Sequence, residues 1–496
     1  MPIYWGDIHS HCGISYGYGA LDNALVNAQK QLDFCAITGH AMWPDMPDDR
    51  EKFGFVIDFH EKGFAKLAAN WEQTQTAVEA ANRPGEFVTF HSYEIHSSAF
   101  GDHHVISPKP CPILPADRPS DLFEKLKPYN AMLIPHHVAY RQGYRGINWD
   151  AYDPVRGSVV EIYSKHGCGL MDRAPYNYLH TMGPRDSRST VVWGLRQGKR
   201  FGFAGSTDHH AGFPGSYGDG RVAVIADRLT RPALLSAIHA RRTYCVTGDK
   251  IVLDFRVGKA MFGEEVSIQG PRPIGFALRG GDAFERVVIY KNGAPWRWYS
   301  PLDLKGPAGS GRFKVRIELG WGRDAEPYAW KSSIALKGGK LLGIEPCFRG
   351  RSILAPEPGD PDYSDVNDLD NAVEGRSADG VQWRCMSFAN ISTQHSATSA
   401  MILEIEGDEA TELVCSVNGQ RFTHAIGELL QGGRAHYEMP FASEAVVVHR
   451  AVPASEYDVS DRAEDAGDLA PGDFYFLEAI QFNGQCAWSS PIWVME

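Results

Sequence analysis

The sequence lacks both a membrane-spanning segment and any cysteine motif. No run of about 18 or more apolar residues occurs among the 496 residues, which argues against a transmembrane helix. The stretch MPIYWGDIHSH has neither the basic flank nor the apolar core of a signal peptide. The nine cysteines are scattered singly without a C-x-x-C pair, so neither a disulfide framework nor a cysteine zinc knuckle is indicated. We therefore expect a cytoplasmic protein that makes no contact with membranes.

Clusters of basic residues are also missing. The formal net charge is −12, and no group of lysines and arginines offers a face for a phosphate backbone. This composition disfavours nucleic-acid binding. A small-molecule substrate, neutral or anionic and held by local positive charge, is the partner that we expect, and the sequence does not indicate an oligomeric state.

The composition of the chain changes near residue 250. Before this point, strand-like apolar runs alternate with helical patterns such as those of 20–32 and 64–82. Beyond it, strand-like runs are separated by Gly, Pro, Asp and Asn. We expect residues 1–250 to form an α/β domain with a parallel sheet, as a closed or nearly closed barrel of about seven units rather than an open sheet. Residues 251–496 are predicted to form a mainly β domain, best described as a sandwich.

Candidate metal ligands follow the ends of the predicted strands in the first half. Fourteen of the 19 histidines lie between His9 and His210. In GDIHSH the two histidines alternate, and alternate residues of a strand face the same way. Because the C-terminal ends of parallel strands share one face, ligands from remote segments are expected to converge there. The candidates are His9, His11, His40, Glu94, His104, His136, Asp208 and His210.

This set of six histidines and two carboxylates exceeds the four ligands of one tetrahedral site. It suffices for two or three divalent ions, with zinc, manganese or iron as the candidates and a carboxylate as a bridge. Two ions about 3.5–4 Å apart can hold a hydroxide between them. Each motif could instead consist of ordinary polar loop residues that bind no metal. Which histidine is the ligand in each of the doublets 103–104, 136–137 and 209–210 stays open.

The ordered motifs resemble a known family. GDIHSH, AITGH, SYEI, DHHVIS, LIPHH and GSTDHH are similar to the successive motifs of the PHP (polymerase and histidinol phosphatase) metallohydrolases, over roughly residues 1–250. VEIYSKHG, RRTYCVTG and the C-terminal AWSSPIWV resemble a PHP-like subgroup with an appended β domain, near the carbaryl-hydrolase-type enzymes. The resemblance implies a distorted (β/α)₇ barrel with the metal ions at the C-terminal strand ends.

The resemblance also implies roles for the ligands. His9, His11 and Asp208 would hold one ion and Glu94 would bridge to a second. His104 and His136 would hold that second ion. His40 and His210 would belong to a third metal position. Two departures bear on the third ion: Gly17 stands where many relatives have a histidine, and Gly39 stands where an acid is usual. A two-metal site, or a third ion with more water ligands, would be consistent with them.

Three further residues are candidates for the chemistry of the site. His166 could act as a general acid, while Arg145 and Lys165 lie in loops expected above the barrel and could bind an anionic group. The aromatic and acidic segment 42–55 is expected either to cover the site as a lid or to pack elsewhere.

The favoured function is a metal-dependent hydrolase that uses a metal-bridging hydroxide. A small phosphoester is the substrate that the family resemblance favours. Hydrolysis of a carboxylic ester or a carbamate is the alternative reaction. The alternative from another class is a metal-stabilised binding protein in which the histidines are structural.

Overall fold

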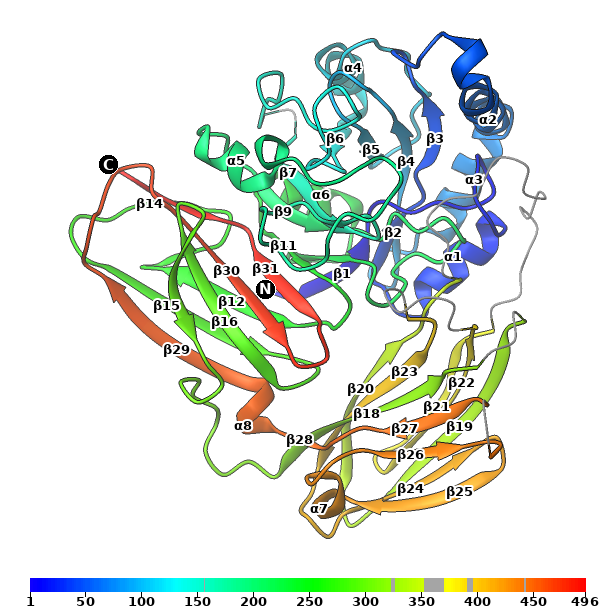
Figure 1. Cartoon of the computed structure of the whole chain (residues 1–496), viewed down its shortest axis with the longest axis vertical. Coiled ribbons are helices and arrows are strands. Elements are labelled where there is room, and N and C mark those ends of the chain that lie inside the picture. The colour runs from blue at the N-terminus through cyan, green and yellow to red at the C-terminus, as the bar shows by residue number, and fades with distance from the viewer. Residues whose placement is uncertain (156, 323–325, 352–369, 390–395, 441–442) are drawn as a thin grey trace.

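The computed structural model describes residues 1–496 except 156, 323–325, 352–369, 390–395 and 441–442. The fold is mixed α/β and rich in strands, and it forms three lobes (Figure 1). One lobe combines helices and strands from the first half of the chain, and the other two consist mainly of strands from the second half. Within the described residues, no helix is both long and apolar enough to cross a membrane.

The helices of the first lobe cover its strands on the outside (Figure 1). The pattern at 64–82 predicts one helix, but Asn70 has non-helical backbone angles and divides it into two. The segment 42–55 is only partly a loop, because the Asp49 side chain caps a helix by accepting a hydrogen bond from the Lys52 N–H. The helices are α1 (Leu21–Gln29), α2 (Arg50–Ala69), α3 (Trp71–Ala81), α4 (Pro119–Leu126), α5 (Val191–Arg196) and α6 (Arg231–His239), with 3₁₀ turns η1 (Lys127–Tyr129) and η2 (Ser187–Ser189).

Strands and helices do form before residue 250, as expected, but the expected parallel sheet is wrong because the strand pairing is mixed. β1 pairs with β2 and β2 with β4 in parallel, whereas β4–β5, β5–β6, β1–β10 and β10–β11 are antiparallel. A short connection between β4 and β5 allows a hairpin-like return, which requires antiparallel pairing. The strands are β1 (Ile3–Asp7), β2 (Phe34–Ala36), β3 (Gly39–Met42), β4 (Val88–Ile95), β5 (His103–Ser107), β6 (Met132–Pro135), β7 (Val159–Ser164), β8 (Gly167–Cys168), β9 (Gly202–Gly205), β10 (Arg221–Ile225) and β11 (Thr243–Val246).

The described strands do not close into one hydrogen-bonded barrel. β6 is the last strand of the main ladder, and β7, β8 and β9 form a separate three-stranded sheet. The main ladder instead continues from β11 into the C-terminal strand β31, with Tyr244 opposite Ser489. The first and last parts of the chain therefore share a single sheet.

The second half builds two β lobes rather than one. One lobe continues the main sheet and adds a four-stranded sheet. It contains β12 (Val252–Val257), β13 (Ala260–Met261), β14 (Glu265–Ser267), β15 (Arg272–Arg279), β16 (Phe284–Lys291), β17 (Ala294–Tyr299), β29 (Asp458–Asp465), β30 (Phe474–Gln481), β31 (Cys486–Ser489) and β32 (Ile492–Met495). A second lobe, made of a six-stranded and a five-stranded sheet, lies between β17 and β29 in the sequence.

The sheets of this second lobe enclose a core, as expected of a β-sandwich, and Phe213 from the first half of the chain also lies in it. Trp330 and Trp383 are among its fully buried side chains. Its elements are β18 (Arg312–Gly320), β19 (Tyr328–Lys337), β20 (Lys340–Cys347), β21 (Ala372–Arg376), β22 (Gly380–Ser387), β23 (Ser399–Glu406), β24 (Glu412–Val417), β25 (Gln420–Ala425), α7 (Ile426–Leu429), β26 (Arg434–Tyr437), β27 (Ala445–Val448) and β28 (Val452–Pro453), followed by α8 (Ala454–Tyr457).

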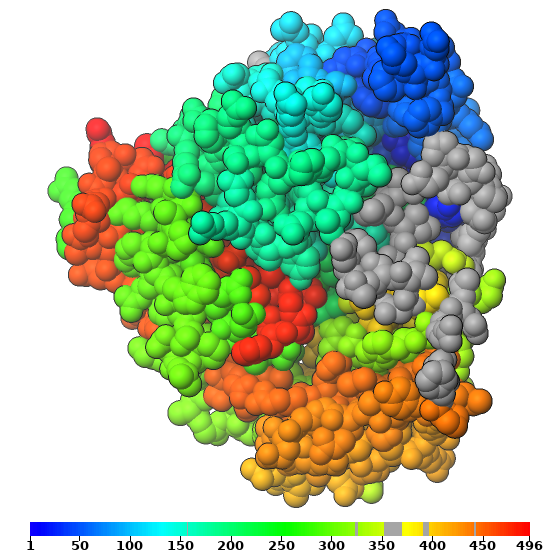
Figure 2. All heavy atoms as spheres, viewed as in Figure 1, coloured from blue at the N-terminus to red at the C-terminus, as the bar shows by residue number. Residues whose placement is uncertain are grey.

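One hydrophobic core is shared between the two halves of the sequence. Trp149 and Phe203 from the first half lie in the same buried cluster as Phe476 and Trp488 from the C-terminal strands. Figure 2 shows the late strands in red between the teal surface of the first lobe and the green strands. Burial of these aromatic side chains holds the α/β lobe against the C-terminal strands.

Candidate metal centre

Strand pairing brings three of the predicted ligands into a row. His40 in β3 lies opposite Glu94 in β4, and Glu94 lies opposite His104 in β5. Neighbouring strands lie about 4.8 Å apart. All three side chains are buried. The register of this sheet therefore places a carboxylate between two imidazoles in the interior.

The H-x-H and D-x-H motifs lie side by side through their backbones. The Asp208 N–H donates to the His9 carbonyl at 2.8 Å, and the His11 N–H donates to the His209 carbonyl at 2.9 Å. Asp208 adopts a left-handed φ of 50°, a conformation that costs energy for a non-glycine residue and recurs at functional sites. The paired segments direct the side chains of His9, His11 and Asp208 to one point.

Asp7 precedes these motifs but points elsewhere. Its buried carboxylate accepts hydrogen bonds from the Thr207 N–H at 3.1 Å, the Thr207 hydroxyl at 2.5 Å and the Gly215 N–H at 2.8 Å. These bonds tie the end of β1 to the loop that carries Asp208. Asp7 thus positions a candidate ligand, and its own carboxylate faces Thr207 and Gly215.

The first ligand group consists of His9, His11 and Asp208. The Nε2 atom of His11 lies 2.9 Å from Oδ1 of Asp208 and 3.2 Å from Nε2 of His9. The Nε2 atom of His9 lies 3.4 Å from the same Asp208 oxygen. Three potential ligand atoms from two remote segments thus face one another.

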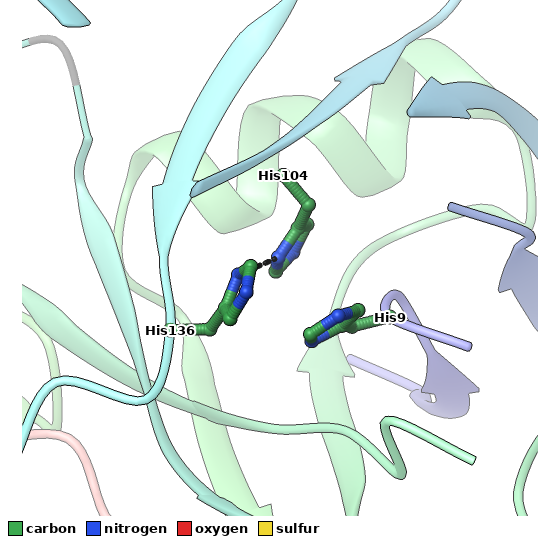
Figure 3. Close-up of side chains that lie close together, drawn as sticks. All are labelled: His9, His104 and His136. Carbon is green, nitrogen blue, oxygen red and sulfur yellow. Dashed lines mark hydrogen bonds between the residues drawn. The ribbon is translucent and has the colours of Figure 1, made fainter. Parts of the chain in front are cut away.

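The second group consists of His9, His104 and His136 (Figure 3). The rings of His104 and His136 point toward one another with their Nδ1 atoms 3.2 Å apart, and His9 faces them. His136 also approaches Glu94, with Nε2 3.0 Å from Oε1. This group adjoins the first through His9.

The third group brings His40 and His210 together with His11. The Nε2 atoms of His40 and His210 lie 3.1 Å apart. A side chain at Gly17 has no room, because a Cβ there would lie 2.6 Å from the Cys12 carbonyl oxygen. The position at which relatives of the resembled family carry a histidine is therefore closed in this chain.

His96 was not predicted and lies at the edge of this third group. Its Nε2 atom is 3.2 Å from Nδ1 of His40, and its Nδ1 atom is 3.2 Å from Oε1 of Glu94. Glu94 and His96 are two residues apart, the same alternate spacing as His9 and His11. From this spacing, His96 could have been predicted as a further candidate ligand.

Glu94 occupies the centre of the site. Its Oε1 atom faces His136 at 3.0 Å, and its Oε2 atom faces His40 at 3.0 Å and His11 at 3.3 Å. Each carboxylate oxygen is thus directed at a different set of imidazoles. A carboxylate so placed can bridge two cations.

The protonation states of these side chains suit metal binding. Burial lowers the pKa of His40, His104 and His210 well below the usual range, and that of His136 to about 4. Burial alone would raise the pKa of Glu94, but the surrounding imidazoles outweigh it and hold that pKa well below its ordinary value. Neutral imidazoles and ionised carboxylates are the forms that coordinate metals.

His9 is oriented by a buried carboxylate that was not predicted. Oε2 of Glu161, in β7, lies 2.9 Å from Nδ1 of His9. Despite burial, the charges of Glu161 and Asp208 raise the pKa of His9, and burial raises the pKa of Glu161. An Nδ1–H donated to the Glu161 carboxylate would fix the tautomer and leave Nε2 for the ligand group.

The distances and the donor set fit divalent cations. The nearest imidazole nitrogens of the three groups are 3.1 to 3.2 Å apart. Ligands of a tetrahedral zinc ion are separated by roughly 3.3 Å, given bonds of about 2.0–2.1 Å. Imidazole and carboxylate together suit zinc, manganese and iron. One pair of ions could be held by His9, His11, Glu94, His104, His136 and Asp208. One further ion could be held by His40 and His210.

The doublets differ in how they face the site. The His103 ring turns away and donates from Nδ1 to the Gly101 carbonyl at 2.8 Å. The buried Nε2 atom of His209 has no hydrogen-bond partner among the described residues, and its ring lies against Gly350. His137 remains close to the ligands, with Nε2 3.4 Å from Oδ2 of Asp208.

The three other predicted residues occupy different places. His166 adjoins the ligands, with Nε2 2.9 Å from Oδ2 of Asp208 and Nδ1 2.9 Å from the Tyr140 hydroxyl. Arg145 lies at the edge, where its Nε donates to Asp102 at 2.7 Å. Lys165 is not brought into the cluster, and its Nζ lies 3.7 Å from Asp219.

Trp43, from the segment 42–55 that was expected either to form a lid or to pack elsewhere, lies beside the site. Its ring contacts the Arg145 guanidinium at 5.2 Å and the His96 ring at 5.7 Å. The tryptophan thus borders the edge of the cluster marked by His96 and Arg145.

Comparison with known proteins gives distant relatives only. No protein-family model matches the chain. It is 26% identical over 256 residues to an uncharacterized protein of Chlamydia pneumoniae, a match that covers 47% of this chain and 41% of that protein. It is 31% identical over 170 residues to an uncharacterized protein of Chlamydia trachomatis, covering 32% of this chain and 27% of that protein. The chain thus spans less than half the length of these relatives.

One solved structure with partial similarity is a two-domain protein from Bacteroides vulgatus that contains a predicted PHP-like metal-dependent phosphoesterase. The sequence identity is 14% and the TM-score 0.33, over 60% of this chain and 85% of that one.

Proposed function

We propose that this protein is a metal-dependent hydrolase of the PHP type that acts on a small phosphoester. The observation that carries the proposal is Glu94, whose two oxygens face different histidine groups in a buried site. Two divalent ions bound there would lower the pKa of a water molecule and neutralise charge on a reacting phosphoryl group. The phosphoester rests on the family resemblance of the sequence motifs.

His166 is the proposed general acid. One of its nitrogens contacts Asp208 and the other the Tyr140 hydroxyl, so both ends of the ring are held. A proton on Nε2 would be shared with Asp208 beside the ligand groups, from where it could pass to the oxygen of a leaving group. Replacing His166 should therefore lower kcat most for substrates with poor leaving groups.

Arg145 is the proposed contact for oxygens of the substrate. Its side chain is 16% exposed, and Asp102 holds its Nε. It has a left-handed φ of 68°, which marks a backbone conformation imposed by the surrounding loop. A guanidinium held by one carboxylate still presents other N–H groups to a phosphoryl oxygen.

The finer architecture belongs to the same proposal. Residues 1–250 carry the proposed ligands and form the hydrolase unit, which we propose to be a distorted (β/α)₇ barrel. Its hydrogen bonding is interrupted between β6 and β7 and between β9 and the main sheet. Residues 251–496 pack against this unit and shape its surroundings.

Metal content and turnover together test the proposal. The purified protein, loaded with zinc, manganese or iron, should hold two or three equivalents by elemental analysis and release phosphate from 4-nitrophenyl phosphate. His136→Ala should lose metal and turnover, whereas the exposed His239→Ala at the end of α6 should lose neither. A protein without bound metal after reconstitution contradicts the proposal.

A second pair of substrates separates the reactions. If the protein hydrolyses an aryl carbamate or an aryl acetate but not the phosphate ester, the proposed activity is ester or carbamate hydrolysis rather than phosphoester hydrolysis. Metal binding without turnover of any substrate, combined with global unfolding of Asp208→Ala, would favour a binding protein with a structural metal site.

A further inference from the structure

A cavity of about 480 Å³ lies next to the candidate metal centre. The turn between β7 and β8 borders both: His166 on this turn contacts Asp208, and the adjacent Lys165 lines the cavity. The Lys165 N–H donates at 3.1 Å to the carbonyl of Thr207, the residue before Asp208. The volume is in the range of small-molecule sites, which enclose about 300–1,000 Å³.

Among the described residues, two cations line this cavity and one anion opposes them. The Lys165 side chain is 3% exposed, and its nearest carboxylate, Asp219, is 3.7 Å away, beyond hydrogen-bond distance. The second cation, Arg349, has a buried Nε without a hydrogen-bond partner among the described residues. Buried charges are normally paired and hydrogen-bonded, so this lining has unused capacity to bind an anion.

The C-terminal half of the chain supplies Arg349. It lies two residues after β20, and its guanidinium stacks over the Tyr217 ring at 4.9 Å. The preceding Phe348 carbonyl accepts from the Tyr217 N–H at 3.0 Å, and the following Gly350 N–H donates to the Ser216 hydroxyl at 3.2 Å. These contacts fix Arg349 on the loop that follows Asp208.

The remaining walls suit a flat ring. The rings of Tyr163 and Tyr176 meet at an angle with their centroids 5.2 Å apart, and Leu179 adds an apolar side chain. Aromatic walls with a few polar groups are typical of sites that bind a cyclic organic body.

We propose that this cavity is a second anion-binding subsite, in which Lys165 and Arg349 hold a carboxylate or phosphate group carried by an aromatic or other ring-containing part of the substrate, remote from the bond that is hydrolysed. This inference deepens the proposed hydrolase function and rests on it. The substrate class is then a ring-containing phosphoester with a second anionic group. Lys165 becomes a specificity-determining residue, and the β-sandwich lobe contributes Arg349 to substrate recognition.

The test uses ligands that do not need to be hydrolysed. We would titrate the metal-loaded full-length protein calorimetrically with 4-hydroxyphenylacetate, 4-hydroxybenzylphosphonate and neutral 4-hydroxyphenylacetamide. The wild-type protein should bind at least one of the anions roughly tenfold or more tightly than the amide, because hydrogen bonds to ionised groups are the strong ones. The stronger of the two anions identifies a carboxylate or a phosphate as the natural group.

Variants show whether the cavity is responsible. Lys165→Met and Arg349→Met should each abolish most of the preference for the anion, whereas Asp219→Asn should strengthen anion binding because it removes the opposing charge. Arg228→Met is the matched control, since Arg228 is 78% exposed and pairs only with Asp227 among the described residues. Arg349→Met keeps an apolar side chain over Tyr217, so it remains informative if the buried Lys165 variant unfolds.

Hydrolysis separates this inference from the function on which it rests. With 4-(carboxymethyl)phenyl phosphate and its amide, Arg349→Met should raise KM for the carboxylate roughly tenfold and leave kcat and the amide's KM nearly unchanged. Absence of turnover with both esters would refute the phosphoesterase and leave the binding result standing. Equal affinity of the wild-type protein for the anions and the amide, or equal effects of Arg349→Met on all three ligands, would overturn the subsite.

Discussion

The hydrogen bond between Glu161 and His9 makes the metal affinity of the site depend on a residue that would not touch the metal. The carboxylate lies 2.9 Å from Nδ1 of His9, and both side chains are fully buried. Glu161→Gln keeps the size of the side chain but removes its negative charge. The imidazole then loses the partner that fixes its tautomer and that makes Nε2 a stronger electron donor.

The expected loss follows from the strength of this bond. A hydrogen bond to an ionised group contributes roughly 1.5–3 kcal/mol, and replacing a carboxylate behind a metal-binding histidine typically costs about 10–100-fold in affinity. Because His9 belongs to two of the ligand groups, we expect Glu161→Gln to weaken zinc binding by about 10–100-fold, which is roughly 1.4–2.7 kcal/mol. The fold should be retained, since the amide fills the same space.

The assay is competition for zinc against a chromophoric chelator at neutral pH. Glu478→Gln is a suitable control, because Glu478 is also a buried glutamate whose pKa burial raises, but it accepts its hydrogen bond from Trp488 at 2.8 Å in the C-terminal strands. Zinc affinity should be unchanged in this control. Wild-type affinity in Glu161→Gln, or an equal loss in both variants, would refute the role given to Glu161.

Three other predictions concern stability. Burial lowers the pKa of His60 to about 3, so the unfolded state gains its proton first as the pH falls below about 6.5, and this residue alone should make the protein about 2 kcal/mol less stable at pH ~5 than at pH ~7. Urea titrations of His60→Phe should show a correspondingly smaller pH dependence, and an unaltered dependence would contradict the assignment. Gly350→Ala places a Cβ 2.6 Å from the His209 ring and should destabilise the protein by about 1–3 kcal/mol. In the control Gly375→Ala, the new Cβ meets nothing within 4 Å, so stability should change by less than about 0.5 kcal/mol. Equal urea midpoints for the two variants would contradict this prediction. A fragment of residues 1–250 should show no cooperative unfolding in calorimetry, because its core includes Phe476 and Trp488; a sharp transition would show that the fragment folds alone.

Much of the ligand set could be predicted because short-range spacing and strand ends are visible in the sequence. His9 and His11 alternate, and each of the other candidates lies within a strand or close to the end of one. The structure brings His40, Glu94 and His104 together through the register of adjacent strands. The pairing of His40 with Glu94 joins segments more than fifty residues apart, and the pairing of Glu94 with His104 depends on an antiparallel return that was not expected, so the sequence could indicate the members of the site but not their distances.

The side chains behind the ligands were missed for a physical reason. Glu161 lies within an apolar strand and Asp7 precedes the H-x-H motif, and neither has a local pattern that separates a buried carboxylate from a solvated one. Their roles depend on the partners that the fold supplies, His9 for Glu161 and Thr207 for Asp7. The direction of strand pairing was also misjudged, because helices between strands indicate crossovers but β4, β5 and β6 return without a parallel crossover.

The shared sheet explains why a composition boundary at residue 250 need not be a functional one. β11 pairs with β31, so the end of the chain extends the sheet that begins with the strand leading to His9. The lobe inserted between β17 and β29 then contacts the loop after Asp208 through Arg349 and Gly350. A substitution in the β-sandwich lobe can therefore reach the metal centre through one loop, and sequence changes near Arg349 should alter which substrates bind more than how fast the bound substrate reacts.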